Sequence, residues 1–148
     1  MKAWAQKQKG FTIVELLIVI VVIAILAAIT IVAYNGIQNR AKDGARDNAV
    51  STIRKVLEQY KIDEGQYPNI CGTANAGCNI SLLSSFAVPK YVASIPNDPE
   101  SSKPIAYVIN STSDGYGLLV RYQSKPECKY LVGTNTATGW WGTAMPTC

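Results

Sequence analysis

Histidine is absent from this 148-residue chain. It is the commonest general base near neutral pH, the usual base of a catalytic triad and the commonest metal ligand. Lysine, glutamate and cysteine still permit some catalysis, but the lack of histidine argues against an enzyme. We therefore predict no catalytic residue, no metal site and no cofactor.

An excess of basic residues is also missing from most of the chain. The sequence has 14 Lys and Arg against 10 Asp and Glu, but Lys2, Lys7 and Lys9 all precede residue 11. Removing residues 1–10 would leave 11 basic and 10 acidic side chains. The bulk composition therefore lacks the basic footprint of nucleic-acid-binding domains, and charge does not support nucleic acid as a partner.

Residues 11–33 form a long apolar run, FTIVELLIVIVVIAILAAITIVA, in which Thr30 is the only polar side chain after Glu15. A helix of about 20 residues spans a hydrocarbon core of about 30 Å. The run is longer than the apolar part of a secretory signal, which has about 7–15 residues. It predicts a single membrane-spanning helix. The basic residues before it predict a cytoplasmic N-terminus and an exported C-terminal part.

The helix is expected to continue beyond the membrane as an amphipathic segment over residues 34–64, which contain no proline. Gly65, followed by Pro68, is a suitable stop. The charged side chains of residues 42–61 are expected to lie mostly on a solvated face. Apolar residues recur three or four positions apart, and so on one face, at Ile37, Ala41, Ala45, Ala49, Ile53, Leu57 and Tyr60.

Residues 65–148 are rich in Gly, Pro, Asn, Ser and Thr and are predicted to form a globular head. Residues 66–80 are expected to be a loop and 81–86 a short helix with Leu82, Leu83 and Phe86 packed inward. Three strands, over 105–110, 116–123 and 127–132, would make an antiparallel meander with one face on the long helix. The predicted fold class is therefore α+β.

Four cysteines, an even number, lie in the predicted exported part. Such a count indicates disulfides and an oxidising compartment, with buried free thiols as the alternative. Four cysteines allow three connectivities. Cys71–Cys78 would close the loop, and Cys128–Cys148 would hold the tail on the last strand, but the connectivity stays open.

Three smaller features each have two interpretations. Asp98 and Asp114 lie in predicted loops, where a turn-forming role is favoured over calcium binding. The Trp140-Trp141 pair is expected to cover the sheet rather than to form an exposed adhesive patch.

Glu15 stands out because a carboxylate in an apolar membrane helix costs about 2.5–3.5 kcal/mol near the helix centre. It lies near the helix start, where the cost is lower, and one interpretation is a side chain that reaches the lipid headgroups. A second interpretation requires a cut between Gly10 and Phe11. The cut would free an α-amino group at Phe11, and Glu15 could neutralise this amine within its own chain or in a neighbouring copy.

The stretch from Lys9 to Glu15 resembles the class III signal of type IV prepilins and pseudopilins. The resemblance implies that a prepilin peptidase cuts after Gly10 and methylates Phe11, and that Glu15 serves assembly. It also implies a homo-oligomeric helical filament built by an inner-membrane platform together with other pilins. The Cys128/Cys148 pair is similar to the C-terminal disulfide loop of many pilins.

Other parts of the chain resemble the major pseudopilins of type II secretion, namely Gln66-Tyr67-Pro68, residues 95–99 and Tyr107. Glu100 stands where that family usually has tryptophan. The proline that often kinks the membrane half of pilin helices is missing near Val32.

These observations predict the following domains: a leader over 1–10, a membrane and filament-core helix over 11–33, its continuation over 34–64, and the head over 65–148. The expected function is that of a type IV pilin, inserted in the inner membrane as a single-pass precursor in contact with lipid. It would then join a surface filament for adhesion, motility or DNA uptake. The alternatives are a pseudopilin in a periplasmic filament and a signal-anchored binding module.

Overall fold

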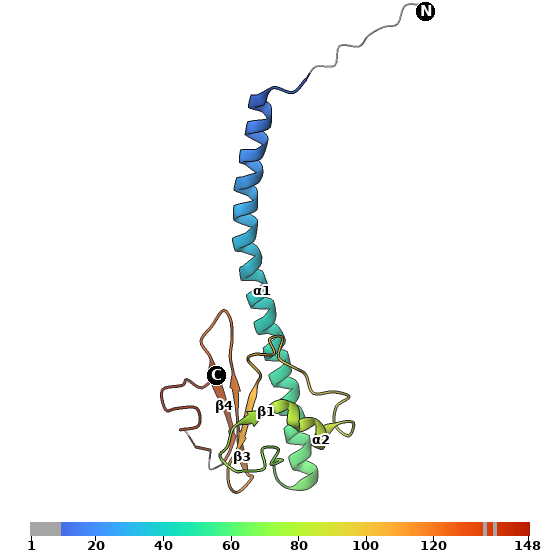
Figure 1. Cartoon of the computed structure of the whole chain (residues 1–148). Coiled ribbons are helices and arrows are strands. Elements are labelled where there is room, and N and C mark those ends of the chain that lie inside the picture. Colours follow the sequence, from blue (N-terminus) through green and yellow to red (C-terminus); the bar gives the residue numbers. More distant parts are fainter. Residues whose placement is uncertain (1–9, 135, 138) are drawn as a thin grey trace, which may run out of the picture. The chain divides into compact units, whose positions relative to one another are not determined.

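The computed structural model describes residues 10–134, 136–137 and 139–148. The chain divides into two compact units at Gln38 and Asn39. Helix α1 (Ile13–Glu64) begins in the first unit and ends in the second (Figure 1). It starts two residues later than expected and stops before Gly65, which has a φ of 79° and donates its N–H to the Lys61 carbonyl at 2.8 Å. A left-handed glycine of this kind is a common helix C-terminus.

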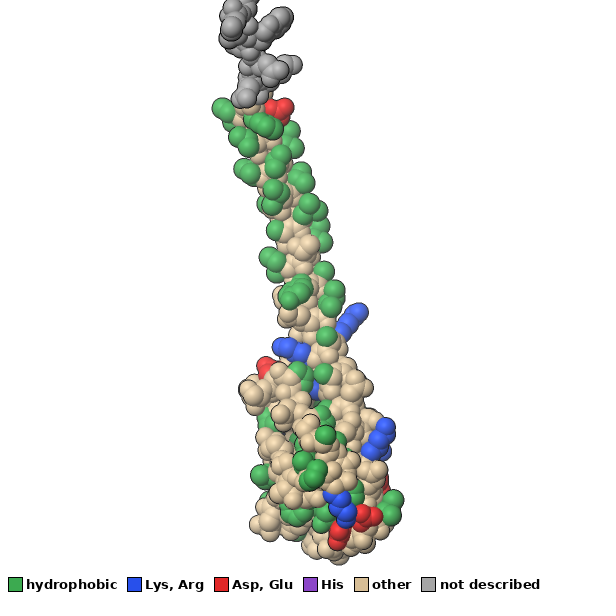
Figure 2. All heavy atoms as spheres, turned by 90° about the vertical axis from the view of Figure 1, so that its right-hand side faces the viewer, with side chains coloured by type: hydrophobic (Ala, Val, Ile, Leu, Met, Phe, Trp, Pro, Cys, Tyr) green, Lys and Arg blue, Asp and Glu red, His purple; other side chains and the backbone are tan. Residues whose placement is uncertain are grey.

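In the first unit, the side chains of α1 are exposed on every side, and apolar residues occupy all faces of the helix. Figure 2 shows one of these faces covered with hydrophobic side chains. By length and composition, α1 is the one helix of the described residues that could cross a membrane. We call residues 13–37 the stem.

The second unit contains a four-stranded antiparallel sheet in the order β1-β2-β3-β4. The strands are β1 (Cys78–Asn79), β2 (Ala106–Ile109), β3 (Gly115–Val120) and β4 (Cys128–Gly133). The α+β class is confirmed, but the expected loop over 66–80 contains one more strand. This strand is hard to see in the sequence because it has two residues, and it forms only by pairing with Tyr107 and Ala106 of β2.

The core lies between α1 and the inner face of the sheet. The buried apolar residues of α1 are Ala49, Val50, Ile53, Val56 and Leu57, and those of the sheet include Tyr107, Ile109, Tyr116, Leu118 and Val120. The expected apolar stripe was wrong at its N-terminal end, where Ile37, Ala41 and Ala45 are exposed. Asp43 and Arg46 are buried instead, because they have polar partners in the head.

A 3₁₀ turn η1 (Ile80–Leu83) and a short helix α2 (Ser84–Ala87) stand where one short helix was expected. Ile80, Leu83 and Ala87 are buried, whereas Leu82 and Phe86 are 48% and 40% exposed. The expected inward packing was therefore correct for Leu83 and wrong for the other two, since the turn begins one residue earlier and presents a different face.

The C-terminal segment, which follows β4 and contains Trp140 and Trp141, covers the outer face of the sheet at β3. Every residue of β3 is therefore buried. A Cβ at Gly117 would lie 2.9 and 3.0 Å from ring atoms of Trp141 and Trp140, which places both indoles against this strand. Trp140 is only 7% exposed. The tryptophan pair therefore packs on the sheet, as the interpretation favoured from the sequence requires.

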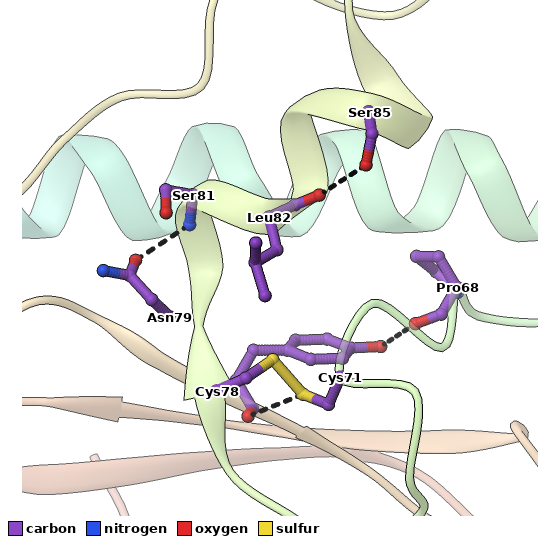
Figure 3. Close-up of a disulfide and its surroundings, with 8 residues drawn as sticks. Pro68, Cys71, Cys78, Asn79, Ser81, Leu82 and Ser85 are labelled. Carbon is purple, nitrogen blue, oxygen red and sulfur yellow. Dashed lines mark hydrogen bonds between the residues drawn. A yellow bond between two sulfur atoms is a disulfide. The ribbon is translucent and has the colours of Figure 1, made fainter.

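Two disulfides fasten the segments outside the sheet. Cys71 joins Cys78, and Cys128 joins Cys148, with Cα–Cα distances of 5.5 and 5.0 Å. The first lies beside β2, where the Tyr107 hydroxyl donates to the Pro68 carbonyl at 2.9 Å (Figure 3). Next to the second, the Lys129 N–H donates to Pro146 and the Cys148 N–H to Lys129, both at 3.0 Å. These two bridges tie the loop after α1 and the C-terminus to the sheet.

Leu82 and Leu83 provide a matched test of this packing. Because Leu83 is fully buried, Leu83→Ala should lower the free energy of unfolding of the head by about 2–5 kcal/mol. Leu82→Ala, at an exposed position, should cost less than about 1 kcal/mol. The measurement is urea unfolding of the detergent-dispersed chain, followed by tryptophan fluorescence. Equal losses in the two variants would contradict the assignment of the core.

Candidate functional site

The residues singled out near the N-terminus lie at the start of α1. Gly10 and Phe11 precede the helix, and the Phe11 side chain is 83% exposed. A Cβ at Gly10 would meet no atom within 4 Å among the described residues. The predicted basic leader, including Lys2, Lys7 and Lys9, lies outside the described residues. The Gly10-Phe11 bond is therefore an exposed backbone segment just before an apolar helix.

Thr12 and Glu15 form a reciprocal cap on the first turn of α1. The Thr12 N–H and hydroxyl both donate to Glu15 Oε2 at 2.8 Å. In return, the Glu15 N–H donates to Thr12 Oγ1 at 3.2 Å. This is the capping box, in which two otherwise unpaired N–H groups are satisfied by side chains three residues apart. Both side chains are exposed, and the carboxylate lies at the positive end of the helix dipole.

Sequence reasoning missed this cap. It treated Glu15 as a charge that needs a cation and gave Thr12 no role. The signal was present, because a threonine followed three residues later by glutamate, just before an apolar run, is the sequence signature of a capping box.

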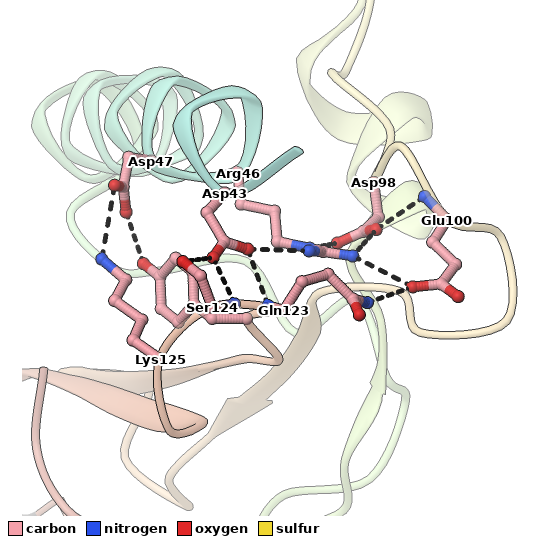
Figure 4. Close-up of polar contacts among 9 residues, drawn as sticks. Asp43, Arg46, Asp47, Asp98, Glu100, Gln123, Ser124 and Lys125 are labelled. Atoms are coloured by element: carbon pink, nitrogen blue, oxygen red, sulfur yellow. Dashed lines mark hydrogen bonds and ion pairs between the residues drawn. The ribbon is translucent and has the colours of Figure 1, made fainter. Parts of the chain in front are cut away.

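A second polar cluster lies in the head, where loop residues reach α1 (Figure 4). The Arg46 side chain is fully buried, and its Nε and Nη2 donate to the two oxygens of Asp98 at 2.8 and 2.9 Å. Its Nη1 donates to Asp43 at 3.0 Å, and Nη2 reaches Glu100 at 3.4 Å. Asp98 raises the pKa of Arg46 above its ordinary value. The guanidinium thus binds the 98–100 loop to the helix.

Asp43 links the same cluster to the segment after β3. It accepts the backbone N–H groups of Gln123 and Ser124 at 2.7 and 2.8 Å, and also the Ser124 hydroxyl. Burial opposes ionisation of this carboxyl, but these bonds and Arg46 outweigh it and lower the pKa of Asp43 to about 2. Asp43 is therefore a charged anchor that binds the segment after β3 to α1.

The cluster corrects the expectation of a solvated charged face on the helix at two positions, because Asp43 and Arg46 are 5% and 0% exposed. Asp47, Arg54, Lys55 and Glu58 are exposed, as expected. Asp98 keeps a turn role, because it accepts the Glu100 N–H at 2.8 Å, but its main partner is Arg46. Asp114 accepts the hydroxyls of Thr112 and Thr134 at 2.7 Å beside the turn between β2 and β3. Among the described residues, no group of three His, Cys, Asp or Glu could hold a metal ion.

Comparison with known proteins starts at the capped helix. A family model described as the prokaryotic N-terminal methylation motif matches residues 5–31. The match contains the Gly10-Phe11 junction, the Thr12–Glu15 cap and most of the stem. The chain carries this N-terminal motif, and over longer stretches it is similar to both type IV pilins and type II secretion pseudopilins.

Curated relatives of both kinds resemble this pilin-like chain. It is 29% identical over 102 residues to the Type II secretion system core protein G of Escherichia coli, covering 63% of this chain and 67% of that protein. It is 42% identical over 74 residues to the Type IV wide pilus major component PilA4 of Thermus thermophilus, covering 50% and 53%. It is 40% identical over 90 residues to the Fimbrial protein EcpC of Eikenella corrodens, covering 61% and 54%. No solved structure matches the chain significantly.

The cluster around Arg46 also explains one departure from the family pattern. Glu100 occupies the position after Asp98-Pro99 where a tryptophan was expected from the resemblance. In this pilin-like chain the Glu100 carboxylate contacts Arg46 at 3.4 Å and accepts a hydrogen bond from the Gln123 side chain. An ionic contact to the helix therefore stands at the position where the resemblance leads one to expect an indole.

Replacing Thr12 tests the cap. Thr12→Ala should weaken the first turn by about 1 kcal/mol, because the Glu15 N–H loses its acceptor. Hydrogen exchange of that amide, measured in detergent micelles, should become about fivefold faster. Thr12→Ser, which keeps the hydroxyl, is the matched control. Equal exchange rates in the two variants would show that the cap does not protect the turn.

Replacing Asp43 tests the head cluster through its pH dependence. A carboxyl whose folded pKa is about 2, below the ordinary value of 3.8, stabilises the fold above pH 3.8 and loses this contribution as pH falls through 2. Asp43→Asn should lower the free energy of unfolding by on the order of 2 kcal/mol near neutral pH, and the difference should shrink toward pH 2.

Asp63→Asn is the control for that measurement, because Asp63 is 44% exposed in its contact with Lys90. It should change the free energy of unfolding far less than Asp43→Asn does, because solvent screens an exposed ion pair. A cost of Asp43→Asn that is the same at neutral and acidic pH would exclude an ionised Asp43 as its source.

Proposed function

We propose that this chain is the structural subunit of a type IV pilus rather than an enzyme. Its precursor sits in the inner membrane, is cut after Gly10 by a prepilin peptidase, is methylated at Phe11 and polymerises into a surface filament. The observation that carries the proposal is the stem, which is apolar on all sides and capped at Thr12–Glu15, within the matched methylation motif.

The exposed stem implies two successive environments. Side chains such as Ile18, Ile23 and Leu26 are 56%, 59% and 58% exposed in the isolated chain, which water would penalise at about 25 cal/mol per Å² of apolar surface. Before assembly, lipid tails cover this surface. After assembly, the stems of neighbouring copies cover it, so the filament has an apolar core.

Glu15 is suited to select how the stems align. Its Oε2 takes both bonds from Thr12, and among the described residues no donor is bonded to Oε1. Cleavage would create an ammonium group at Phe11, four residues earlier in the chain. A cation and a carboxylate that enter an apolar core must pair with each other, because an unpaired buried charge is far more costly. The pair would therefore fix one axial offset between copies.

A pseudopilin role is the second candidate, and a specific observation favours it. Relatives named Type II secretion system core protein G, from several organisms, align with 63–66% of this chain. Imaging of cells with an antibody against the head separates the two roles. Long surface filaments support the pilus, and short structures confined to the periplasm support the secretion system.

A signal-anchored binding module is the remaining alternative, and the first residue of the mature protein decides it. Mass spectrometry should find N-methylated Phe11. An N-terminal Met1 on abundant native protein would instead indicate an uncut anchor and exclude a role as a filament subunit.

Replacing Glu15 tests the assembly role. Glu15→Ala should still be processed and inserted in the membrane, but filaments in electron micrographs of cells should become rare, because the Phe11 amine loses its carboxylate. Thr12→Ala separates charge from capping, since it removes the cap and keeps the carboxylate, and it should retain more filaments. Normal filament numbers in Glu15→Ala would overturn the pairing role.

Replacing Gly10 tests the cut site, and Gly10→Ala should leave uncut precursor.

A further inference from the structure

The outer face of the sheet is covered by the C-terminal segment at β3 but remains open beside β1 and β2. An open groove of about 710 Å³ lies there, between β1, the residues before β2 and the side chain of Trp141. Its volume is in the range of small-molecule sites, about 300–1,000 Å³. The side chains that concern recognition are Asn79, Ser102, Lys103, Arg121 and Trp141.

The charged side chains of this groove are all cationic. Among the described residues no acid lines it, and Lys103 makes no ion pair. Arg121 donates to the Pro104 carbonyl at 3.2 Å and contacts Glu127 at 3.5 Å, but that glutamate is 49% exposed. Such an exposed pair contributes little and leaves the guanidinium open to exchange partners. The groove is thus positively charged.

The neutral groups of the groove add hydrogen-bond donors. Asn79 uses its side-chain oxygen to accept the Ser81 N–H at 2.9 Å, which leaves its amide NH₂ free to donate (Figure 3). Ser102 is exposed and contributes a hydroxyl. Together with Lys103 and Arg121, these groups match a ligand that carries several acceptor oxygens.

Trp141 forms a fixed aromatic wall. Its φ of 58° is uncommon for a residue with a side chain, and such conformations persist only where the surroundings impose them. Here the indole lies against two glycines, Gly117 of β3 and Gly77 just before β1. A Cβ at these positions would lie 2.9 and 3.5 Å from the indole. The ring is therefore held in place at the groove by the sheet beneath it.

We propose that this groove binds an acidic sugar unit of a polysaccharide. Lys103 and Arg121 bind the carboxylate, Asn79 and Ser102 donate to ring or hydroxyl oxygens, and the indole of Trp141 packs against the C–H groups of the sugar ring. This binding would be an activity of the head alone, beyond the proposed role in the filament.

Charge distribution favours a sugar acid over single-stranded nucleic acid. Nucleic-acid grooves follow the phosphate backbone with a continuous track of cations and with several stacking aromatic rings. This groove has two cations and one indole, and one of the cations is shared with Glu127. The number of groups fits one carboxylated ring rather than a chain of phosphates.

The experiment measures binding of tetragalacturonate to the full chain dispersed in detergent, by calorimetry and tryptophan fluorescence. Lys103→Glu should weaken binding by about tenfold or more, because it replaces the unpaired cation with an anion. Trp141→Gly removes the ring and accepts the positive φ, so it should weaken binding; because it also uncovers Gly117, its binding is measured below its own urea midpoint, where the head is folded. Lys55→Glu, an identical charge change on exposed α1 outside the groove, is the matched control and should bind normally.

Three probes define the outcomes. The neutral methyl ester of the same tetrasaccharide should bind at least about tenfold more weakly than the acid. Equal affinity for acid and ester, or equal losses in Lys103→Glu and Lys55→Glu, would overturn the proposal. Tighter binding of a thymidine octanucleotide with the same dependence on Lys103 and Trp141 would also overturn it, in favour of nucleic acid. Because the dispersed chain is not polymerised, failure here would leave the filament role unaffected.

Discussion

The stem, an apolar helix that water cannot solvate favourably, constrains everything else in this protein. Burial of such surface is worth about 25 cal/mol per Å², so a helix with large aliphatic side chains on every face must always be covered. In the proposed function, lipid and other copies of the same helix are the two coverings. Membrane insertion and polymerisation would then be successive solutions to one physical problem.

The one carboxylate at the start of this stem becomes intelligible once its cap is known. In the isolated chain, Thr12 holds Glu15 and satisfies the first turn of α1. The cap occupies one carboxylate oxygen of Glu15 without a cation. In the proposed function, the other oxygen is available to the amine that cleavage would create. In the proposed function, one side chain would thus serve local helix structure first and contact between subunits later.

The head is a small domain that is fastened at several places. A core of this size gives a modest stability by itself, and disulfides commonly supplement it. Here Cys71–Cys78 and Cys128–Cys148 fix the segments around the sheet, while Arg46 joins the 98–100 loop to the helix. The C-terminal segment then covers β3 and leaves the groove beside Trp141 open. The groove is exposed because the C-terminal segment does not extend over β1.

Local sequence was sufficient for the features that depend on near neighbours: the unbroken apolar run, the helix stop at Gly65, the three longer strands and the Gly10–Glu15 junction. It should also have revealed the Thr12–Glu15 cap, whose partners are three residues apart. Tertiary structure alone decided the burial of Arg46, because its partner Asp98 lies 52 residues away. It likewise decided that β1 pairs, that Leu82 and Phe86 stay exposed, and that Trp141 borders a cationic groove. Periodicity reports which side chains share a face, but only the folded chain determines what that face meets.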